Sequence, residues 1–288
     1  MKYLRKALMG IALLGLAFAF FMMQMGFRTS DAATRRYFKK RGMDVEIHRI
    51  AYRSDSLRWV ETGSEAPDAP LVVFVHGAPG SANNFYKYLA DTALQSQARL
   101  LCLDRPGYGY SAYGKADVAI QDQAGAVMEV IQTKGSNRSV ILVGHSYGGP
   151  IAAKTAMDYP KQVTALLMLA PVNDPAHEPL FWYSNFAAWK STRWMLSPAW
   201  KVAGAEKFSH AKELQKISTG WSKLHIPVVH LHGEKDQLAP PVNADFSKRN
   251  IPAQSLRLVR MPKAGHLIPF VQYPVVQAEI LQLLQQQP

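Results

Sequence analysis

Short apolar runs without polar interruption recur along the chain and alternate with longer stretches of mixed composition. Runs of this kind, rich in Val, Ile and Leu, are typical of strands that are buried on both faces of a sheet. The runs that we interpret as strands are residues 71–75, 99–103, 140–143, 163–170, 226–231 and 255–261. Residues 45–60 predict two further short strands, with a turn at residues 52–56.

Stretches in which apolar residues recur at helical spacing separate these strands. They include residues 83–97, 116–133 and 274–285. Strands that alternate with helices are joined by right-handed crossovers, which make neighbouring strands parallel. The pattern therefore predicts an α/β fold with a mostly parallel central sheet flanked by helices. Ligands of such sheets bind at the carboxyl ends of the strands.

One of the apolar runs, residues 140–143, leads directly into a Gly-His-Ser-Tyr-Gly sequence centred on Ser146, and a helical stretch follows. A strand, a sharp turn with serine at its tip and a helix form the context in which Gly-x-Ser-x-Gly marks a nucleophile. Small residues must flank the serine because the turn forces strained backbone geometry and close packing. We therefore predict that Ser146 is a nucleophile.

Serine is a weak nucleophile unless a base takes its proton, and the base needs an acid that orients it. His266 lies in a glycine-bearing loop after the last predicted strand, and Asp236 follows the strand before it. We predict that Ser146, His266 and Asp236 form a catalytic triad. Asp174, which follows the strand at residues 163–170, is the one alternative acid.

The tetrahedral intermediate of such a reaction carries a negatively charged oxygen, which two backbone N–H groups must stabilise. We assign one donor to Tyr147, the residue after the nucleophile. We expect the other in the loop after residues 71–75, where the pair His76 and Gly77 points to the N–H of Ala78.

Five motifs of this chain stand in an order that is known from one superfamily. They are residues 76–80, 104–111, 144–149, 233–236 and 265–266. With the chain order serine, aspartate, histidine, they make the chain resemble the α/β-hydrolase superfamily, in its branch of esterases, haloperoxidase-like enzymes and C–C bond hydrolases. The resemblance implies an α/β-hydrolase domain over residues 42–288, with a short helical lid at about residues 174–222. Asp104 and Arg105 are usually architectural in such proteins, so we leave them out of the catalytic set.

The triad favours a serine hydrolase that cleaves an ester or related acyl bond through a covalent acyl-enzyme, with no metal or organic cofactor. Two alternatives remain open: a C–C bond hydrolase with the same triad, and a non-catalytic binding protein that kept the fold. Residues 174–222 contain five of the six tryptophans, so we expect a small-molecule, apolar ester substrate.

Several other site classes find little support in the sequence. Cys102 is the only cysteine, which rules out an internal disulfide, and its apolar neighbours predict a buried position. His230 and His232 share one face of a predicted strand, but no third ligand lies near them, so we expect no metal site. The net charge of +12 is concentrated: residues 1–41 hold nine of the 33 Lys and Arg residues and a single acid, Asp31. We therefore expect no nucleic-acid partner.

The N-terminal residues 1–41 predict a membrane segment and a basic linker. Residues 7–27 are almost wholly apolar, and at about 1.5 Å of rise per residue they match a hydrocarbon core of about 30 Å. We therefore predict a single-pass membrane anchor. The first basic charges favour an exported (periplasmic or extracytoplasmic) hydrolase domain, although the basic linker opposes this orientation. A cleaved signal peptide, with a weak cleavage site at residues 30–32, is the alternative.

Overall fold

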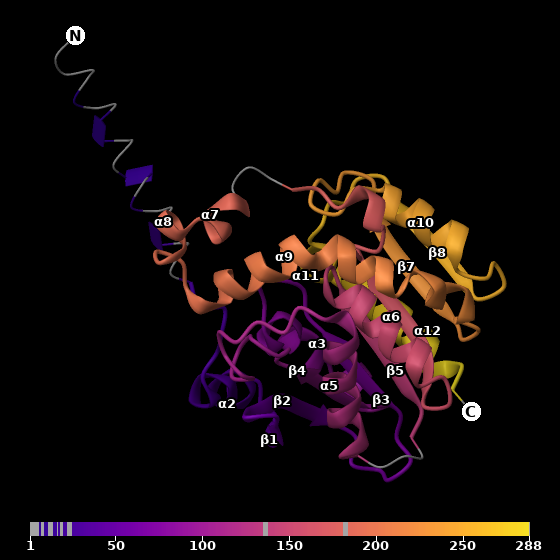
Figure 1. The fold of residues 1–288 in the computed structure, drawn as a ribbon. Coiled ribbons are helices and arrows are strands. Elements are labelled where there is room, and N and C mark those ends of the chain that lie inside the picture. Colours follow the sequence, from indigo (N-terminus) through magenta and orange to yellow (C-terminus); the bar gives the residue numbers. More distant parts are fainter. Residues whose placement is uncertain are drawn as a thin grey trace.

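Eight strands in the described part of the chain form one sheet (Figure 1). The computed structural model describes residues 25–134, 138–180 and 184–287, and scattered positions between residues 6 and 21. The strands are β1 (Glu46–Tyr52), β2 (Asp55–Gly63), β3 (Leu71–Val75), β4 (Arg99–Leu103), β5 (Val140–His145), β6 (Val163–Leu169), β7 (Val228–Gly233) and β8 (Leu256–Met261). Their order across the sheet is β1-β2-β4-β3-β5-β6-β7-β8.

The strands from β4 across to β8 run parallel to one another. At the other edge, β1 pairs with β2 and β2 pairs with β4, both antiparallel. Because β3 lies between β4 and β5, Val75 is level with Leu103 on one side and with Gly144 on the other. The loops that follow these three strands therefore start side by side. The predicted α/β fold with a mostly parallel sheet is confirmed.

Alternate residues of the central strands contribute to two separate cores, one on each face of the sheet. The helices that cover the two faces are α2 (Asp31–Lys39), α3 (Tyr86–Leu89), α4 (Thr92–Gln95), α5 (Ile120–Gln132), α6 (Gly148–Asp158), α10 (Val242–Asn250), α11 (Ile268–Val271) and α12 (Tyr273–Gln285). Val73 and Leu142 pack with α5 and α6 in one core. Val72, Ile141 and Cys102 belong to the other core, with α3 and α12. Cys102 is fully buried, as predicted.

The chain between β6 and β7 leaves the strand–helix alternation. It contains η2 (Pro175–His177), α7 (Asn185–Ala188), α8 (Lys190–Arg193), α9 (Pro198–Lys216) and η4 (Ser218–Lys223). The long helix α9 crosses above the sheet (Figure 1). Its position is fixed by two contacts: Glu206 pairs with Arg105, just after β4, and the ring of His210 stacks on Tyr147, just after β5. The segment therefore lies at the carboxyl ends of these strands.

The stretch that we predicted as a linker contains a packed helix, α2. The hydroxyl of Ser30 accepts the N–H of Ala33, and Asp31 places a negative charge in the first turn. Both features stabilise a helix start. Phe38 of this helix is fully buried in the core with α3 and α12.

The predicted helix over residues 83–97 is broken into η1 (Ala82–Phe85), α3 and α4. The break between α3 and α4 occurs at Asp91, whose carboxylate accepts the N–H of Leu94 and so starts α4 as its N-cap. The same carboxylate accepts hydrogen bonds from Tyr273 and Gln277 of α12. These contacts with α12 fix the position of the break. Because the partners are distant in the sequence, the local spacing of apolar residues does not predict the break.

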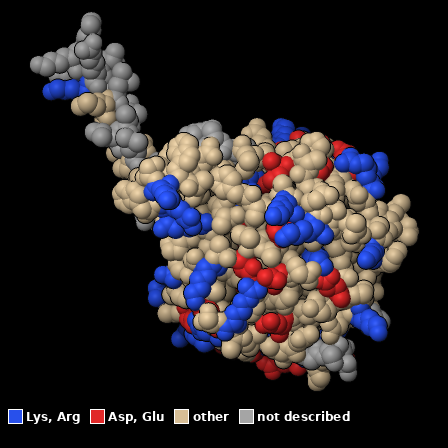
Figure 2. Space-filling view, viewed as in Figure 1, with Lys and Arg blue, Asp and Glu red and all other residues tan. Residues whose placement is uncertain are grey.

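Basic side chains on the body of the protein stand among acidic ones, as one face shows in Figure 2. Arg53 pairs with Asp117 at 3.0 Å and with Asp122 at 2.9 Å. Arg260 pairs with Glu234 at 3.0 Å. Much of the positive charge outside the N-terminal segment is therefore compensated locally.

The predicted single-pass membrane anchor is wrong. Among the residues that the structure describes, no helix is long and apolar enough to cross a membrane. Many positions of residues 7–27 lie outside the described residues. The apolar run matches a hydrocarbon core in length and composition, but those two properties by themselves do not establish a spanning helix. The predicted exported placement of the hydrolase domain was inferred from this anchor, so it is not supported either.

Gly148→Ala is expected to destabilise the fold, because an added Cβ would lie 2.2 Å from the backbone oxygen of Val75. Overpacking of this kind typically costs about 1–3 kcal/mol. Gly125→Ala, within α5, is the matched control: its Cβ would meet no atom within 4 Å. We expect the control to raise the free energy of unfolding by up to about 1 kcal/mol. Chemical denaturation measures both, and equal stabilities would contradict the close packing of α6 on β3.

Candidate active site

Ser146 lies at the tip of the turn between β5 and α6. Its φ is +53°, in the left-handed region that residues with a side chain rarely adopt. The backbone N–H of Ser146 donates to the backbone oxygen of Leu169 at 3.0 Å. The backbone oxygen of Ser146 accepts the N–H of Gly149 at 2.9 Å. An added Cβ at Gly144 would lie 2.5 Å from the oxygen of Gly148. The strained turn therefore requires the glycines that flank the serine in the sequence.

Three side chains from three different loops form a hydrogen-bonded line at this edge of the sheet. Ser146 follows β5, Asp236 follows β7 and His266 follows β8. The Nε2 atom of His266 lies 2.9 Å from the Oγ of Ser146, and its Nδ1 atom lies 2.8 Å from the Oδ2 of Asp236. An ionised carboxylate only accepts, so Nδ1 carries a proton and Nε2 of the neutral ring can accept one from the serine. The arrangement can therefore activate a hydroxyl for attack.

Asp236 is almost fully buried, and the turn that follows it fixes its carboxylate. The Oδ1 atom accepts the N–H groups of Leu238 at 2.9 Å and Ala239 at 2.8 Å. This leaves Oδ2 for His266. The turn itself is held by His232, whose Nε2 donates to the oxygen of Ala239 at 2.9 Å. The hydrogen bonds thus aim one carboxylate oxygen at the imidazole.

His230 and His232, the pair that shares a strand face, are hydrogen-bonded to each other, and His232 holds the turn after Asp236. His230 Nε2 lies 3.0 Å from His232 Nδ1, which must accept because His232 Nε2 is the donor to Ala239. Burial lowers the pKa of both rings below its usual value. Over the described residues, the structure contains no group of three or more side chains that could hold a metal ion.

Asp174, the alternative acid, lies in a different set of contacts. Its Oδ1 accepts the N–H of Ala176 at 2.9 Å, and its Oδ2 lies 3.0 Å from Nδ1 of His177. Its contacts therefore differ from those of Asp236, which bonds to His266. The structure brings Asp236, and not Asp174, to the histidine that contacts Ser146.

The two backbone donors that we predict for an oxyanion lie in segments that contact or adjoin Ser146. Gly77 comes so close that an added Cβ would lie 3.0 Å from the Cβ of Ser146, and Ala78 follows it. Tyr147 is buried and directly precedes α6. N–H groups at a helix start have no partner within the helix, and the helix dipole favours negative charge there. The geometry is compatible with both donors, whose assignment stays a prediction.

His145, next to the nucleophile, supports the loop that carries His266. Its Nε2 donates to the backbone oxygen of His266 at 3.1 Å. Burial, followed by the neighbouring His266 ring, lowers the pKa of His145 to about 3. The ring is therefore neutral near pH 7 and acts as a fixed hydrogen-bond donor.

Comparison with known proteins agrees with this architecture. Residues 70–203 match the family model described as the alpha/beta hydrolase fold. A membrane phospholipase A superposes with a TM-score of 0.63 at 18% identity, covering 99% of this chain and 98% of that one. The chain has the α/β-hydrolase fold.

Two curated relatives differ in how much of their own length this chain matches. Lipase 1 of Psychrobacter immobilis is 25% identical over 271 residues, which cover 82% of each protein. The dihydrolipoyllysine-residue acetyltransferase component of the acetoin cleaving system of Cupriavidus necator is 33% identical over 104 residues. That match covers 36% of this chain and spans only 27% of the acetyltransferase component.

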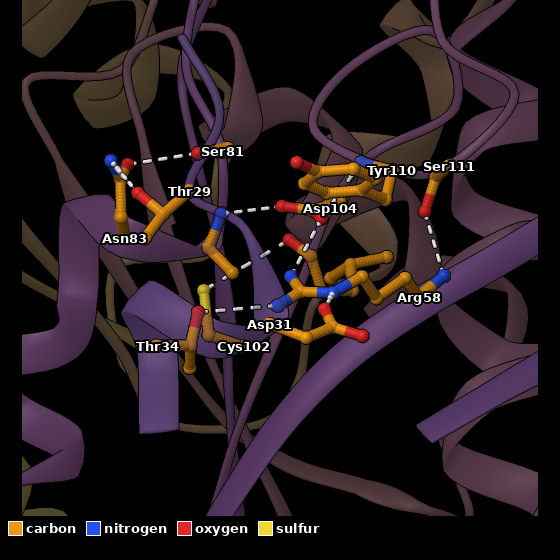
Figure 3. Close-up of polar contacts among 12 residues, drawn as sticks. Thr29, Asp31, Thr34, Arg58, Ser81, Asn83, Cys102, Asp104, Tyr110 and Ser111 are labelled. Carbon is orange, nitrogen blue, oxygen red and sulfur yellow. Dashed lines mark hydrogen bonds and ion pairs between the residues drawn. The ribbon is translucent and has the colours of Figure 1, made fainter. Parts of the chain in front are cut away.

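Asp104, which we left outside the predicted catalytic set, holds two loops of the protein together (Figure 3). Its Oδ1 accepts the N–H of Ala82 at 2.8 Å, and its Oδ2 accepts from the N–H of Tyr110 at 3.0 Å and from Arg58 at 2.9 Å. Arg58 in turn reaches Asp31 of α2 at 2.9 Å. Asp104 thus ties the loop after β3 to the loop after β4.

Proposed function

We propose that this protein is a serine hydrolase that cleaves an ester or related acyl bond through a covalent acyl-enzyme. One observation carries the proposal: the line from Ser146 through His266 to Asp236, with hydrogen-bond distances of 2.9 and 2.8 Å. The α/β-hydrolase fold and the similarity to Lipase 1 support it.

In the proposed reaction, Ser146 Oγ attacks the acyl carbon while His266 Nε2 takes its proton. Asp236 stays ionised, and it orients the ring and stabilises the imidazolium that forms. The acyl oxygen becomes negatively charged in the tetrahedral intermediate, where the N–H groups of Ala78 and Tyr147 stabilise it. His266 then protonates the leaving alcohol, which leaves the acyl group on Ser146. A water molecule, deprotonated by His266, releases the acid by the same steps.

We further propose that the substrate carries an apolar group. Large apolar side chains lie exposed just after two members of the proposed triad: Leu238 after Asp236, and Leu267, Phe270 and Val271 after His266. The segment over the sheet edge also exposes apolar side chains, namely Leu180, Trp189, Trp194 and Phe208. These two sets suit an acyl chain or an apolar alcohol.

Residues 174–222 would then form the lid of a hydrolase domain that spans residues 42–288. The contacts of α9 with Arg105 and Tyr147 support this role, because they hold the helix next to the proposed nucleophile. A lid that covers a nucleophile excludes water, which strengthens the electrostatic interactions inside the site.

Ser146→Ala should abolish hydrolysis of p-nitrophenyl esters and leave the fold intact. The expected loss of kcat is on the order of 10⁴-fold or more, because members of a triad act as a unit. Steady-state kinetics measure the loss, and circular dichroism checks the fold. A variant that keeps activity within tenfold of the parent would refute the assignment of the nucleophile.

Asp236→Asn should lower kcat by roughly 10³- to 10⁴-fold, because an amide can no longer hold the required tautomer of His266. Asp174→Asn is the matched control, because Asp174 is also a buried acid that contacts a histidine, His177. It should retain kcat within a few-fold of the parent. If Asp174→Asn proves more damaging than Asp236→Asn, the acid has been assigned to the wrong residue.

A further inference from the structure

The peptide group between Gly77 and Ala78 receives two hydrogen bonds on its carbonyl side. Nδ1 of His76 lies 2.7 Å from the oxygen of Gly77, and Nη2 of Arg105 donates to the same oxygen at 3.0 Å. The N–H of this peptide group is the one that we assign to the oxyanion. The oxygen of this peptide is therefore held by His76 and Arg105, and in the proposed reaction its N–H would donate to the acyl oxygen.

The tautomer of His76 is fixed by Arg105. The backbone N–H of Arg105 donates to Nε2 of His76 at 3.0 Å, so Nε2 bears no proton and Nδ1 must be the donor to Gly77. Burial, followed by the charge of Arg105, holds the pKa of His76 well below its usual value. Nε of Arg105 also donates to the backbone oxygen of His76 at 2.8 Å. One arginine thus fixes both carbonyl groups that precede Ala78.

Arg105 is itself held by the helix that crosses the sheet edge. Nη1 of Arg105 donates to Oε1 of Glu206 at 2.6 Å, and both side chains are fully buried. Glu206 also accepts from the hydroxyl of Tyr108 at 2.6 Å and from Nε2 of Gln123 at 2.9 Å. A buried ion pair keeps its geometry when further hydrogen bonds satisfy its remaining donors and acceptors. Glu206 of α9, together with the Oε1 atom of Gln123, therefore holds the side of the guanidinium group that faces away from the two carbonyls.

A cation that donates to a peptide oxygen has two effects on the N–H of the same peptide. It fixes the plane of the group, because the peptide bond is rigid, and it draws electron density toward the oxygen, which makes the N–H a stronger donor. A preorganised and polarised donor is what an oxyanion requires, since no reorganisation is then needed during the reaction.

We infer that Arg105, oriented by Glu206 and acting with His76, is a positioning residue that aligns and polarises the Gly77–Ala78 peptide as an oxyanion donor. The inference rests on the proposed serine hydrolase function. It also gives α9 a second role besides covering the site, because the carboxylate that orients the arginine belongs to this helix. Displacing α9 would remove that carboxylate from the arginine.

The test compares Arg105→Lys with Arg99→Lys in the full chain. A lysine at 105 keeps the positive charge beside Glu206, but its single ammonium group cannot also reach both carbonyls. Arg99 is the matched control: it is a largely buried arginine of β4 that pairs with Glu61 and Glu46 and lies outside the proposed machinery. Two quantities are measured: kcat and KM for a p-nitrophenyl ester, and the inhibition constant of an alkyl boronic acid. The boronic acid forms a tetrahedral adduct with the serine, whose boron-bound oxygen occupies the oxyanion position.

For Arg105→Lys we expect kcat to fall about 10- to 100-fold with KM within a few-fold, because only the transition state is affected. The affinity for the boronic acid should fall by a similar factor. Arg99→Lys should leave both quantities near those of the parent, whatever its effect on thermal stability. Unchanged kcat and unchanged boronic acid affinity in Arg105→Lys would overturn the inference and leave Arg105 a structural residue.

Glu206→Gln keeps the inference testable if Arg105→Lys does not fold. It preserves shape and removes the charge that orients the guanidinium, so kcat and boronic acid affinity should again fall together. Retention of both would overturn the inference. If the parent protein hydrolyses the ester and the variants have the same kcat and boronic acid affinity, this inference is wrong and the proposed function stands. A parent that neither hydrolyses the ester nor binds the boronic acid contradicts the proposed function, and the inference with it.

Discussion

The positive φ of Ser146 is the constraint on which the rest of the site depends. A serine in this conformation projects from the tip of a turn only if strand, helix and neighbouring loops pack directly on the turn. Close contacts accomplish this on several sides: Gly148 lies against the oxygen of Val75, Gly149 against Pro171 and Gly77 against the serine itself. Two of these contacts come from the end of β3 and the loop after it, and the third comes from the loop after β6. The strain at one residue is therefore held by the packing of the loops after β3 and β6.

Two buried charged residues hold the loop after β3 in addition to the close glycine contacts. Asp104 and Arg105 are consecutive, yet they act on opposite ends of the loop after β3. Asp104 accepts the N–H of Ala82 at its far end, whereas Arg105 holds the oxygens of His76 and Gly77 at its start. Burying such charges is costly unless they are paired, and both are paired, Asp104 with Arg58 and Arg105 with Glu206. The loop beside the proposed nucleophile is thus clamped by ionic groups that are fully compensated.

The sequence was sufficient for the sheet and for the candidate site because both depend on local signals. Uninterrupted apolar runs predict buried strands. The loops at the carboxyl ends of parallel strands lie at one edge of the sheet, so Ser146, Asp236 and His266 could be predicted to lie close together. The break at Asp91 and the role of Arg105 could not be predicted, because each depends on a partner that is distant in the chain. Glu206 lies on α9, which is joined to Arg105 by no local pattern. The membrane anchor was predicted from the length and composition of residues 7–27, and among the described residues no helix is long and apolar enough to cross a membrane.

The central claim is that the hydrogen-bonded line at the sheet edge activates one particular hydroxyl. Incubation with a fluorophosphonate, followed by digestion and mass spectrometry, tests it most directly. An activated serine attacks the phosphorus, fluoride leaves, and a stable phosphonyl ester remains on the serine. The account predicts a single adduct on the peptide that contains Ser146, and its loss when the protein is unfolded before labelling. No adduct on the folded protein, or an adduct on another serine while Ser146 stays unmodified, would contradict it.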